Sequence, residues 1–215
     1  MNLSALRDRA RALSGIRLQT LRSDEQIDAV INESYQEIIG LSQWPFLRSS
    51  QQVAIASGVN SFETPTGYSE ITSISYTDDS GYTVRLQPTT IDEIDRLRDQ
   101  EDSEPTLYAR VTDREFAIWP TPNSNLTLQI RGKEKVESLS GDSDTPVFDD
   151  QFHPILAYRA ASRMLAEEGD DSGRSEFYQQ EANNFFVRMQ QFYNRTADVG
   201  MFVMGGRRRR LVNGR

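Results

Sequence analysis

Residues 27–47 read IDAVINESYQEIIGLSQWPFL, and a helical pattern ends within this stretch shortly before a strand pattern begins. Its apolar row repeats at +4, +3, +4 and +3, the spacing of one face of an amphipathic helix. Ser23 followed by Gln26 forms a capping-box pattern at the start. Gly40 and the Trp44-Pro45-Phe46 run end the helix, because proline lacks an N–H and restricts the preceding residue. The sequence therefore predicts a helix over about 24–43, with a row made of Ile27, Ile31, Ser34, Ile38 and Leu41.

Three other segments show the same helical spacing and predict helices over about 3–14, 150–168 and 175–194. None of the four helices can bury its apolar row alone, so we expect them to pack on one another. The three rows are Leu3, Leu6, Ala10 and Leu13; Ile155, Tyr158, Ser162 and Leu165; and Tyr178, Ala182, Phe185, Met189 and Phe192.

Between the second and third helices, from about 50 to 135, the period changes to two. A capping box of Thr90 and Glu93 predicts one short helix within this region, and turns are expected at 78–82 and 112–115. The strand-like runs are QQVAIAS, SEITSISYTD, YTVRLQP, TLYARVT, REFAIWP and NLTLQIRGK. The expected fold class is α+β: an antiparallel bundle of about four helices with a β-rich insertion, forming one domain over 1–199.

Charge is distributed unevenly along the 215 residues, which contain 24 Lys and Arg against 32 Asp and Glu. The last sixteen residues, GMFVMGGRRRRLVNGR, hold five arginines and no acid. The other 199 residues therefore have 19 basic and 32 acidic side chains, a net charge of −13. An acidic body repels nucleic acid at long range, whereas a basic tail attracts an acidic or anionic surface, so we expect the two parts to face different partners.

Residues 200–215 are predicted to form a flexible arm, because Gly200, Gly205 and Gly206 disfavour regular structure. Its arginines lie beside apolar side chains, which argues against a tail that is only solvated. A disordered tail and a nucleic-acid contact through the arginine run remain the alternatives. The candidate contact residues are Met201, Phe202, Val203, Met204, Arg207, Arg208, Arg209, Arg210, Leu211 and Arg215.

The inventory of metal-binding side chains is short. There is no cysteine and one histidine, His153, so a zinc site of the His/Cys type is excluded. His153 precedes Pro154 at a helix start, where we expect a satisfied or exposed side chain. The acidic run GDSDTPVFDD lacks the mid-loop glycine and terminal glutamate of an EF-hand, so a solvated loop and a helix cap are expected. Its acids are Asp142, Asp144, Asp149 and Asp150.

Complete catalytic motifs are missing from the sequence as well. No serine lies in a G-x-S-x-G pattern, and Gly200 and Gly205 are not followed by the Lys-Ser/Thr of a phosphate-binding loop. We therefore predict no enzyme activity, no metal and no cofactor. A carboxylate-based cell-wall hydrolase stays an alternative, because 32 acids always offer pairs. No window reaches the roughly 18 apolar residues of a membrane helix, and the charged start MNLSALRDRARAL does not resemble a secretory signal.

Several patterns along residues 20–195 resemble the head-to-tail adaptor (connector) proteins of tailed bacteriophages, in particular the tail accessory adaptors of short-tailed phages. The first is the helix ending in Trp-Pro-Phe, residues 27–47. The second is EFAIWPTPNSNLTLQIRGK, residues 115–133, and the third is DTPVFDDQFHPILAYRAASRMLAEEGD, residues 144–170. An aromatic final helix with EFYQQEANNFFVRM follows in the expected order.

The resemblance implies a virion protein of the head–tail junction, made in the bacterial host cytoplasm and assembled as a homo-oligomeric ring, typically a dodecamer. One side of the ring would contact the portal protein. The other would receive tail proteins such as nozzle, tail fibre or tail tube components. Double-stranded DNA would pass through the channel without specific binding, which suits an acidic body. A C-terminal arm commonly reaches onto the portal in such adaptors, so residues 200–215 are expected to be a portal-docking arm.

Overall fold

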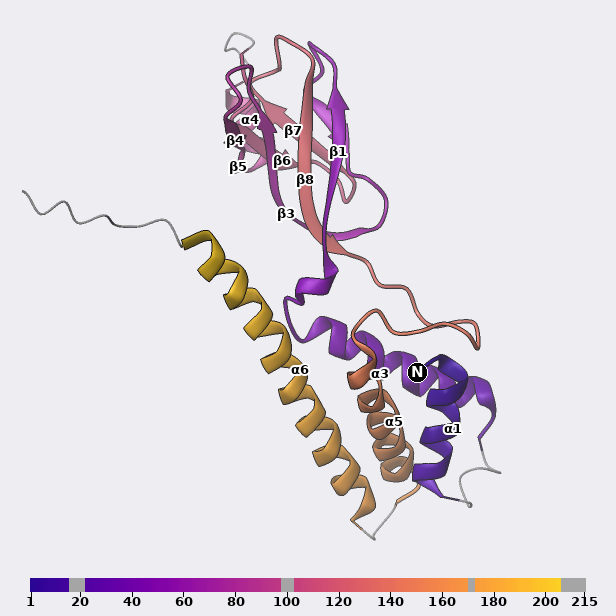
Figure 1. Ribbon diagram of the computed structural model, residues 1–215. Coiled ribbons are helices and arrows are strands. Elements are labelled where there is room, and N and C mark those ends of the chain that lie inside the picture. Colours follow the sequence, from indigo (N-terminus) through magenta and orange to yellow (C-terminus); the bar gives the residue numbers. More distant parts are fainter. Residues whose placement is uncertain (16–21, 98–102, 170–172, 206–215) are drawn as a thin grey trace, which may run out of the picture. The chain divides into compact units, whose positions relative to one another are not determined.

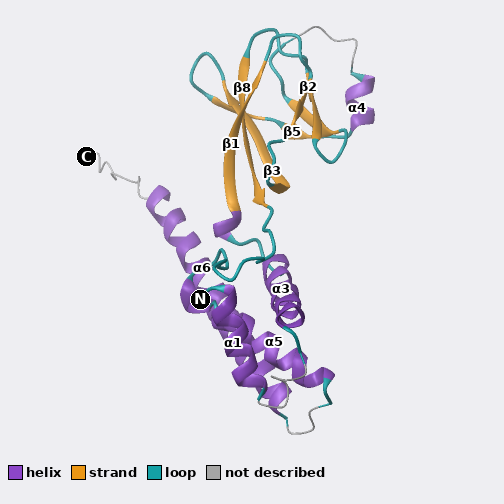
Figure 2. Cartoon of the chain, turned by 90° about the vertical axis from the view of Figure 1, so that its right-hand side faces the viewer, coloured by secondary structure: helices purple, strands orange, loops and turns teal. Residues whose placement is uncertain are grey.

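The computed structural model describes residues 1–15, 22–97, 103–169 and 173–205. It confirms the α+β fold class, with helices and two β-sheets (Figures 1 and 2). The sequence predicts one domain over 1–199, and the structure shows two compact units within the chain. The helical unit contains Met1–Phe46 and the chain from Val136 onward, and the β unit is Leu47–Lys135.

Four helices make up most of the described part of the helical unit. They are α1 (Leu3–Ser14), α3 (Asp24–Gly40), α5 (Pro154–Glu167) and α6 (Arg174–Gly205). Helix α5 is central, because α1, α3 and α6 all contact it (Figure 1). A central helix must be apolar on most faces. Accordingly, the buried residues of α5 include Ile155, Leu156, Ala157, Ala160, Ala161, Met164 and Leu165.

Helix α3 shows where the predicted helical pattern holds and where it fails. The capping box is present: the Ser23 hydroxyl accepts from the Gln26 N–H at 3.4 Å, and the Gln26 side chain accepts from the Ser23 N–H at 3.0 Å. The row from Ile27 to Ile38 is buried as predicted. The prediction that Leu41 belongs to the buried row is wrong, because α3 ends at Gly40 and half of the Leu41 surface is exposed.

Charged side chains hold the helices to one another. Arg7 of α1 donates to Asp28 of α3 at 2.6 Å, and Arg159 of α5 lies 2.9 Å from a carboxylate oxygen of Glu37 in α3. Arg159 is itself buried. Hydrogen bonds between ionised groups are among the stronger polar contacts, so these pairs fix how α1, α3 and α5 lie against one another.

The described part of the β unit contains eight strands in two four-stranded sheets. Sheet A has the order β1 (Arg48–Ile55), β8 (Leu126–Glu134), β3 (Tyr68–Thr77) and β4 (Thr83–Arg85). Sheet B has the order β2 (Ser61–Glu63), β7 (Glu115–Trp119), β6 (Leu107–Arg110) and β5 (Gln87–Pro88). The short helix α4 (Ile91–Arg96) begins after Thr90, whose hydroxyl accepts from the Glu93 N–H as expected.

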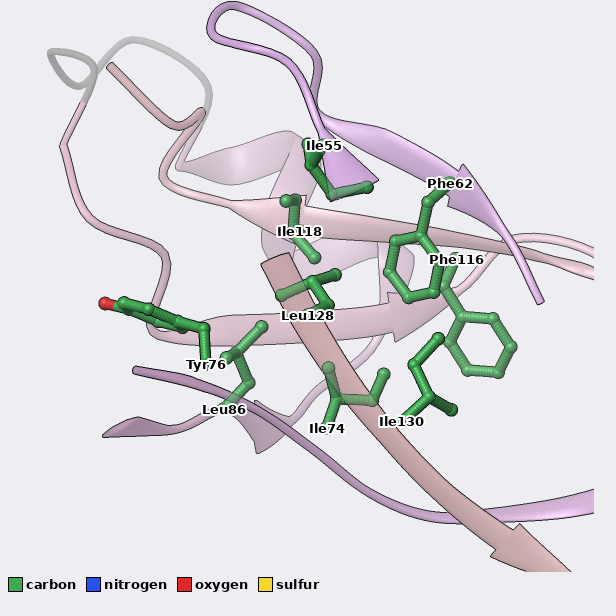
Figure 3. Packing of buried hydrophobic residues seen from close by; sticks show 9 residues of the cluster. All are labelled: Ile55, Phe62, Ile74, Tyr76, Leu86, Phe116, Ile118, Leu128 and Ile130. Atoms are coloured by element: carbon green, nitrogen blue, oxygen red, sulfur yellow. The ribbon is translucent and has the colours of Figure 1, made fainter. Parts of the chain in front are cut away.

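The two sheets share one apolar core (Figure 3). Sheet A contributes side chains from β1, β3 and β8, sheet B contributes side chains from β2 and β7, and Leu86 lies between β4 and β5. Inward positions alternate with outward ones along each strand, as a two-sided sheet requires. The core residues are Ile55, Phe62, Ile74, Tyr76, Leu86, Phe116, Ile118, Leu128 and Ile130.

Both predicted turns of the β unit are present. The Asp78 carboxylate accepts from the backbone N–H of Ser80 and Tyr82, and the Thr112 hydroxyl accepts from the N–H of Glu115. Two details differ from expectation. Strand β2 was not predicted, and the run YTVRLQP forms two strands in different sheets rather than one.

Helix α6 is longer than the predicted 175–194, and this changes the expected arm. It continues through Gly200 and ends at Gly205, so the backbone of Met201–Met204 is helical. A glycine inside a helix costs only about 1 kcal/mol relative to alanine, and no proline follows to stop the helix. The helix therefore extends beyond the predicted end at 194, while the flexible arm over 200–215 stays a prediction, because residues 206–215 lie outside the described residues.

Candidate functional site: the C-terminal helix and arm

Helix α6 packs on α5 along the row that the sequence predicts. Ala182 and Met189 are fully buried, and Phe185 is half-buried, with its ring stacked on that of Tyr158 at a centroid distance of 5.7 Å. The prediction that Phe192 is a core residue is wrong, since 40% of its surface is exposed. Sequence periodicity thus located the contact face of α6 in its first half but not in its second.

A cluster of aromatic rings holds the second half of the described part of α6. Phe186 and Tyr193 lie against Trp44, at centroid distances of 5.8 and 5.9 Å, and Tyr193 also lies 4.8 Å from Phe46. Edge-to-face and tilted pairs of this kind add stability beyond their buried area. We call this group the aromatic cluster; its members are Trp44, Phe46, Phe148, Phe152, Phe186, Phe192 and Tyr193.

Hydrogen bonds fix the polar atoms within and beside the cluster. The Trp44 indole N–H donates to the Ile38 carbonyl at 2.8 Å, and the Asp149 N–H donates to the Tyr193 hydroxyl at 3.0 Å. Burial raises the pKa of Tyr193, and the hydrogen bond from Asp149 partly opposes that shift. Buried aromatic residues with a satisfied polar atom are held in one orientation. The cluster therefore sets the direction of the helix that leads into residues 195–205.

The cluster joins segments far apart in the chain. Trp44 and Phe46 follow α3, while Phe148 precedes and Phe152 ends the 3-10 turn Asp150–Phe152 before α5. Three of the sequence patterns that carry the phage resemblance thus meet here: the Trp-Pro-Phe run, the approach to α5 and the aromatic last helix. The sequence predicts each motif but not the contacts between them, because no local period links residues about a hundred positions apart.

The acids of the run GDSDTPVFDD hold the local structure. The Asp144 carboxylate accepts from the N–H of Ser140 and of Gly141, both at 2.8 Å, and these hydrogen bonds lower the pKa of Asp144, with Gly141 the larger cause. Asp142 pairs with Arg7 at 2.9 Å, and Asp149 caps the 3-10 turn. The expected Asp cap is thus present on the 3-10 turn before α5, whereas α5 itself begins after His153 with no side-chain cap. The described residues hold no group of three potential metal-ligating side chains.

His153 is a packing residue in this structure. It is buried, and its Nε2–H donates to the Phe148 carbonyl at 2.8 Å, while Nδ1 lies 2.6 Å from the Met1 amino group. The ring also meets that of Phe148 edge-on. The expectation of a satisfied histidine at the start of a helix is confirmed.

The ten candidate contact residues of the arm lie at or beyond the end of the described chain. The backbone of Met201, Phe202, Val203 and Met204 forms the last turns of α6, and their side chains lie outside the described residues. Arg207–Arg210, Leu211 and Arg215 also lie outside them. The described part of α6 itself presents exposed apolar side chains, Phe177 and Val187.

The described helices include none that is both long and apolar enough to cross a membrane. Within the described chain, the side chains of the sequence motifs serve packing, helix capping and charge pairing, which is the pattern of a structural component. The family model described as SU10 adaptor protein matches residues 1–209. The protein belongs to this adaptor family, and the resemblance to phage head-to-tail adaptors is thereby confirmed. No curated protein matched the chain.

Proposed function

We propose that the protein is the head-to-tail adaptor of a tailed-phage virion, forming a ring, typically a dodecamer, below the portal protein. The ring extends the DNA channel and provides the platform on which tail proteins such as nozzle, tail fibre or tail tube components attach. The single observation that carries this proposal is the adaptor-family match over residues 1–209. The protein would be made in the host cytoplasm and reside at the head–tail junction, acting without catalysis.

The C-terminal arm is the element that we propose docks on the portal. The aromatic cluster holds α6 in one direction, so the arm would leave each copy from a defined place. Residues 201–204 supply apolar area and Arg207–Arg210 supply charge. Arginines form bidentate hydrogen bonds with carboxylates, and apolar side chains add buried area, so together they suit an acidic portal surface with an apolar hollow.

The length of α6 divides the proposed arm into a helical apolar part and a following basic part. The apolar residues belong to the end of a helix and the arginines follow it. An apolar helix end fits a groove, whereas exposed charges act through steering that salt screens. We therefore expect the two parts of the arm to contribute to different steps of binding.

Two truncations and two substitutions test the docking arm. Ending the chain after Gly205 removes the arginines, and ending it after Val199 also removes the apolar turns. Replacing Arg207–Arg210 with Gln should slow association with purified portal and flatten its salt dependence. Replacing Phe202 and Met204 with Ser should mainly speed dissociation. A variant with residues 206–215 in scrambled order controls for charge alone.

Binding kinetics at low and high salt, with electron micrographs of the adaptor–portal mixture, give the readout. The proposal is supported if the full chain forms rings on portals and the chain ending at Val199 does not. If that truncated chain binds portal as tightly and with the same salt slope, the docking arm is refuted. Retention of the full chain on duplex DNA that depends only on Arg207–Arg210 would instead support the nucleic-acid alternative.

A further inference from the structure

The strand register defines a large polar face on the outer side of sheet A, with two register shifts between β3 and β8. In β8, Leu128 and Ile130 point into the core, so the odd-numbered residues point outward. The register places Gln129 beside Gln52 and Ser75, and Arg131 beside Ser50 and Ser73. The face consists of Arg48, Ser50, Gln52, Ala54, Glu70, Ser73, Ser75, Thr77, Thr83, Arg85, Thr127, Gln129, Arg131 and Lys133.

This face is basic in an acidic unit. The β unit, residues 47–135, has 9 Lys and Arg against 14 Asp and Glu. The outer face nevertheless carries four cations and one acid, Glu70, which stands beside Lys133 in the register. Arg48, Lys133 and Arg131 lie on adjacent strands or two residues apart on one strand, so their backbone positions are separated by only about 5–7 Å. They form one compact positive area.

The three arginines of the face have no carboxylate partner within the part of the chain that the structure describes. Among the described residues, Arg48, Arg85 and Arg131 form no salt bridge, and all three are exposed. In the helical unit, by contrast, Arg7 and Arg159 each pair with an acid. In a chain with more acids than bases, exposed arginines without a partner are available to an anion from outside the chain.

The neighbours of these cations favour phosphate over a protein surface. Apart from Ala54, the other neutral side chains of the face are hydroxyls and amides of Ser, Thr and Gln. Protein–protein interfaces have an apolar centre, which this face lacks. Arg, Lys, Ser, Thr and Gln are the side chains that position a protein on the sugar–phosphate backbone without reading its sequence.

We infer that the outer face of sheet A contacts the phosphate backbone of double-stranded DNA, weakly and without sequence preference. This inference deepens the proposed function, on which it rests, by naming the face of each copy that meets the DNA in transit. Four cations per copy give a contact that salt easily weakens, which lets a duplex move past. The net negative charge of the rest of the unit keeps DNA from binding elsewhere.

The test is DNA binding by the full chain, with Arg207–Arg210 and Arg215 replaced by Gln so that the arm charges do not contribute. In this background, the face variant carries Arg48→Gln and Arg131→Gln. The matched control carries Arg96→Gln and Arg114→Gln, the same charge change on α4 and in the β6–β7 turn. Anisotropy of a labelled mixed-sequence duplex is measured between about 50 and 200 mM salt. Labelled poly-glutamate serves as the second probe, and circular dichroism checks the fold.

The face variant should bind duplex more weakly, and its slope of log K against log salt should fall by about 1.8, since each lost phosphate contact removes about 0.9. The control should keep the slope of its background. An unchanged slope in the face variant overturns the inference, as does an equal loss in the control. Poly-glutamate binding that the face variant loses equally also overturns it, because the face would then recognise acidic protein.

Portal assembly separates this inference from the proposed function. If rings form on portals but the face substitutions leave DNA binding unchanged, only the DNA contact is refuted. Failure of the unaltered chain to assemble on portals refutes the proposed function, whatever the anisotropy shows.

Discussion

Replacing Trp44 with Ala should strongly lower the free energy of unfolding of the helical unit, because the Trp44 ring is the centre of the aromatic cluster. Only 3% of its surface is exposed, and it contacts the rings of Phe46, Phe186 and Tyr193. Truncating a buried Trp to Ala typically costs about 3–5 kcal/mol of the free energy of unfolding. The indole hydrogen bond to Ile38 adds a net of about 1 kcal/mol.

The carbonyl that loses this bond keeps a partner, which limits the penalty. The Leu41 N–H also donates to the Ile38 carbonyl, at 3.3 Å, so the substitution leaves no buried acceptor unpaired. We therefore expect a total loss of about 4–6 kcal/mol for Trp44→Ala. Trp44→Phe keeps a ring and loses the N–H, so about 1–2 kcal/mol is expected.

Urea unfolding followed by circular dichroism at 222 nm measures the loss in the helices. Phe177→Ala is the matched control, because it removes an aromatic ring of α6 itself from a position that is 56% exposed. The control should change the free energy of unfolding by no more than about 0.5 kcal/mol. If Trp44→Ala has no larger effect than Phe177→Ala, the cluster does not hold α6 and the reasoning fails.

Three further predictions follow from the packing. Phe185→Ala should cost about 1–2 kcal/mol rather than the 3–5 of a full core residue, because the ring is only half-buried; thermal unfolding checks this. Gly132→Ala should destabilise the β unit by at least about 2 kcal/mol, since its Cβ would clash with the Glu70 carbonyl oxygen, whereas Gly40→Ala has open space and should be neutral or stabilising in urea unfolding. Burial, reinforced by Glu104, raises the pKa of Tyr76 to about 12, so the stability that neutral Tyr76 adds is present below about pH 10 and is lost as pH rises towards 12. Tyr76→Phe should therefore reduce the loss of stability between those pH values, and an equal loss in the variant would contradict this.

Sequence reasoning succeeded where one local pattern determines one local structure. The capping box at Ser23, the row from Ile27 to Ile38 and the Asp78 turn each depend on neighbours within a few residues. It failed where the chain changes direction or partner. Leu41 fits the helical spacing but lies past the end of α3. The run YTVRLQP is split at Leu86, so that its first part pairs in sheet A and its last part in sheet B.

The end of α6 shows a different limit. The sequence predicts that the last helix ends at about 194 and that a flexible arm begins at 200, because Gly200, Gly205 and Gly206 lower helix propensity. Propensity is a small term of about 1 kcal/mol, and a helix already nucleated over many residues extends through a single glycine. The aromatic cluster was missed for a third reason, because Trp44, Phe148 and Tyr193 are brought together only by the packing of α3, α5 and α6.

The aromatic cluster gives the sequence motifs a role in packing. Trp44, Phe148 and Tyr193 lie at three separate places in the sequence, yet each contributes a ring to the same cluster. A binding arm gains affinity when its root is held in one orientation, because less conformational freedom is then lost on docking. The cluster supplies that restraint at the part of α6 that precedes residues 195–205. Rings from three of the four sequence patterns that resemble phage adaptors thus orient the helix from which the proposed arm extends.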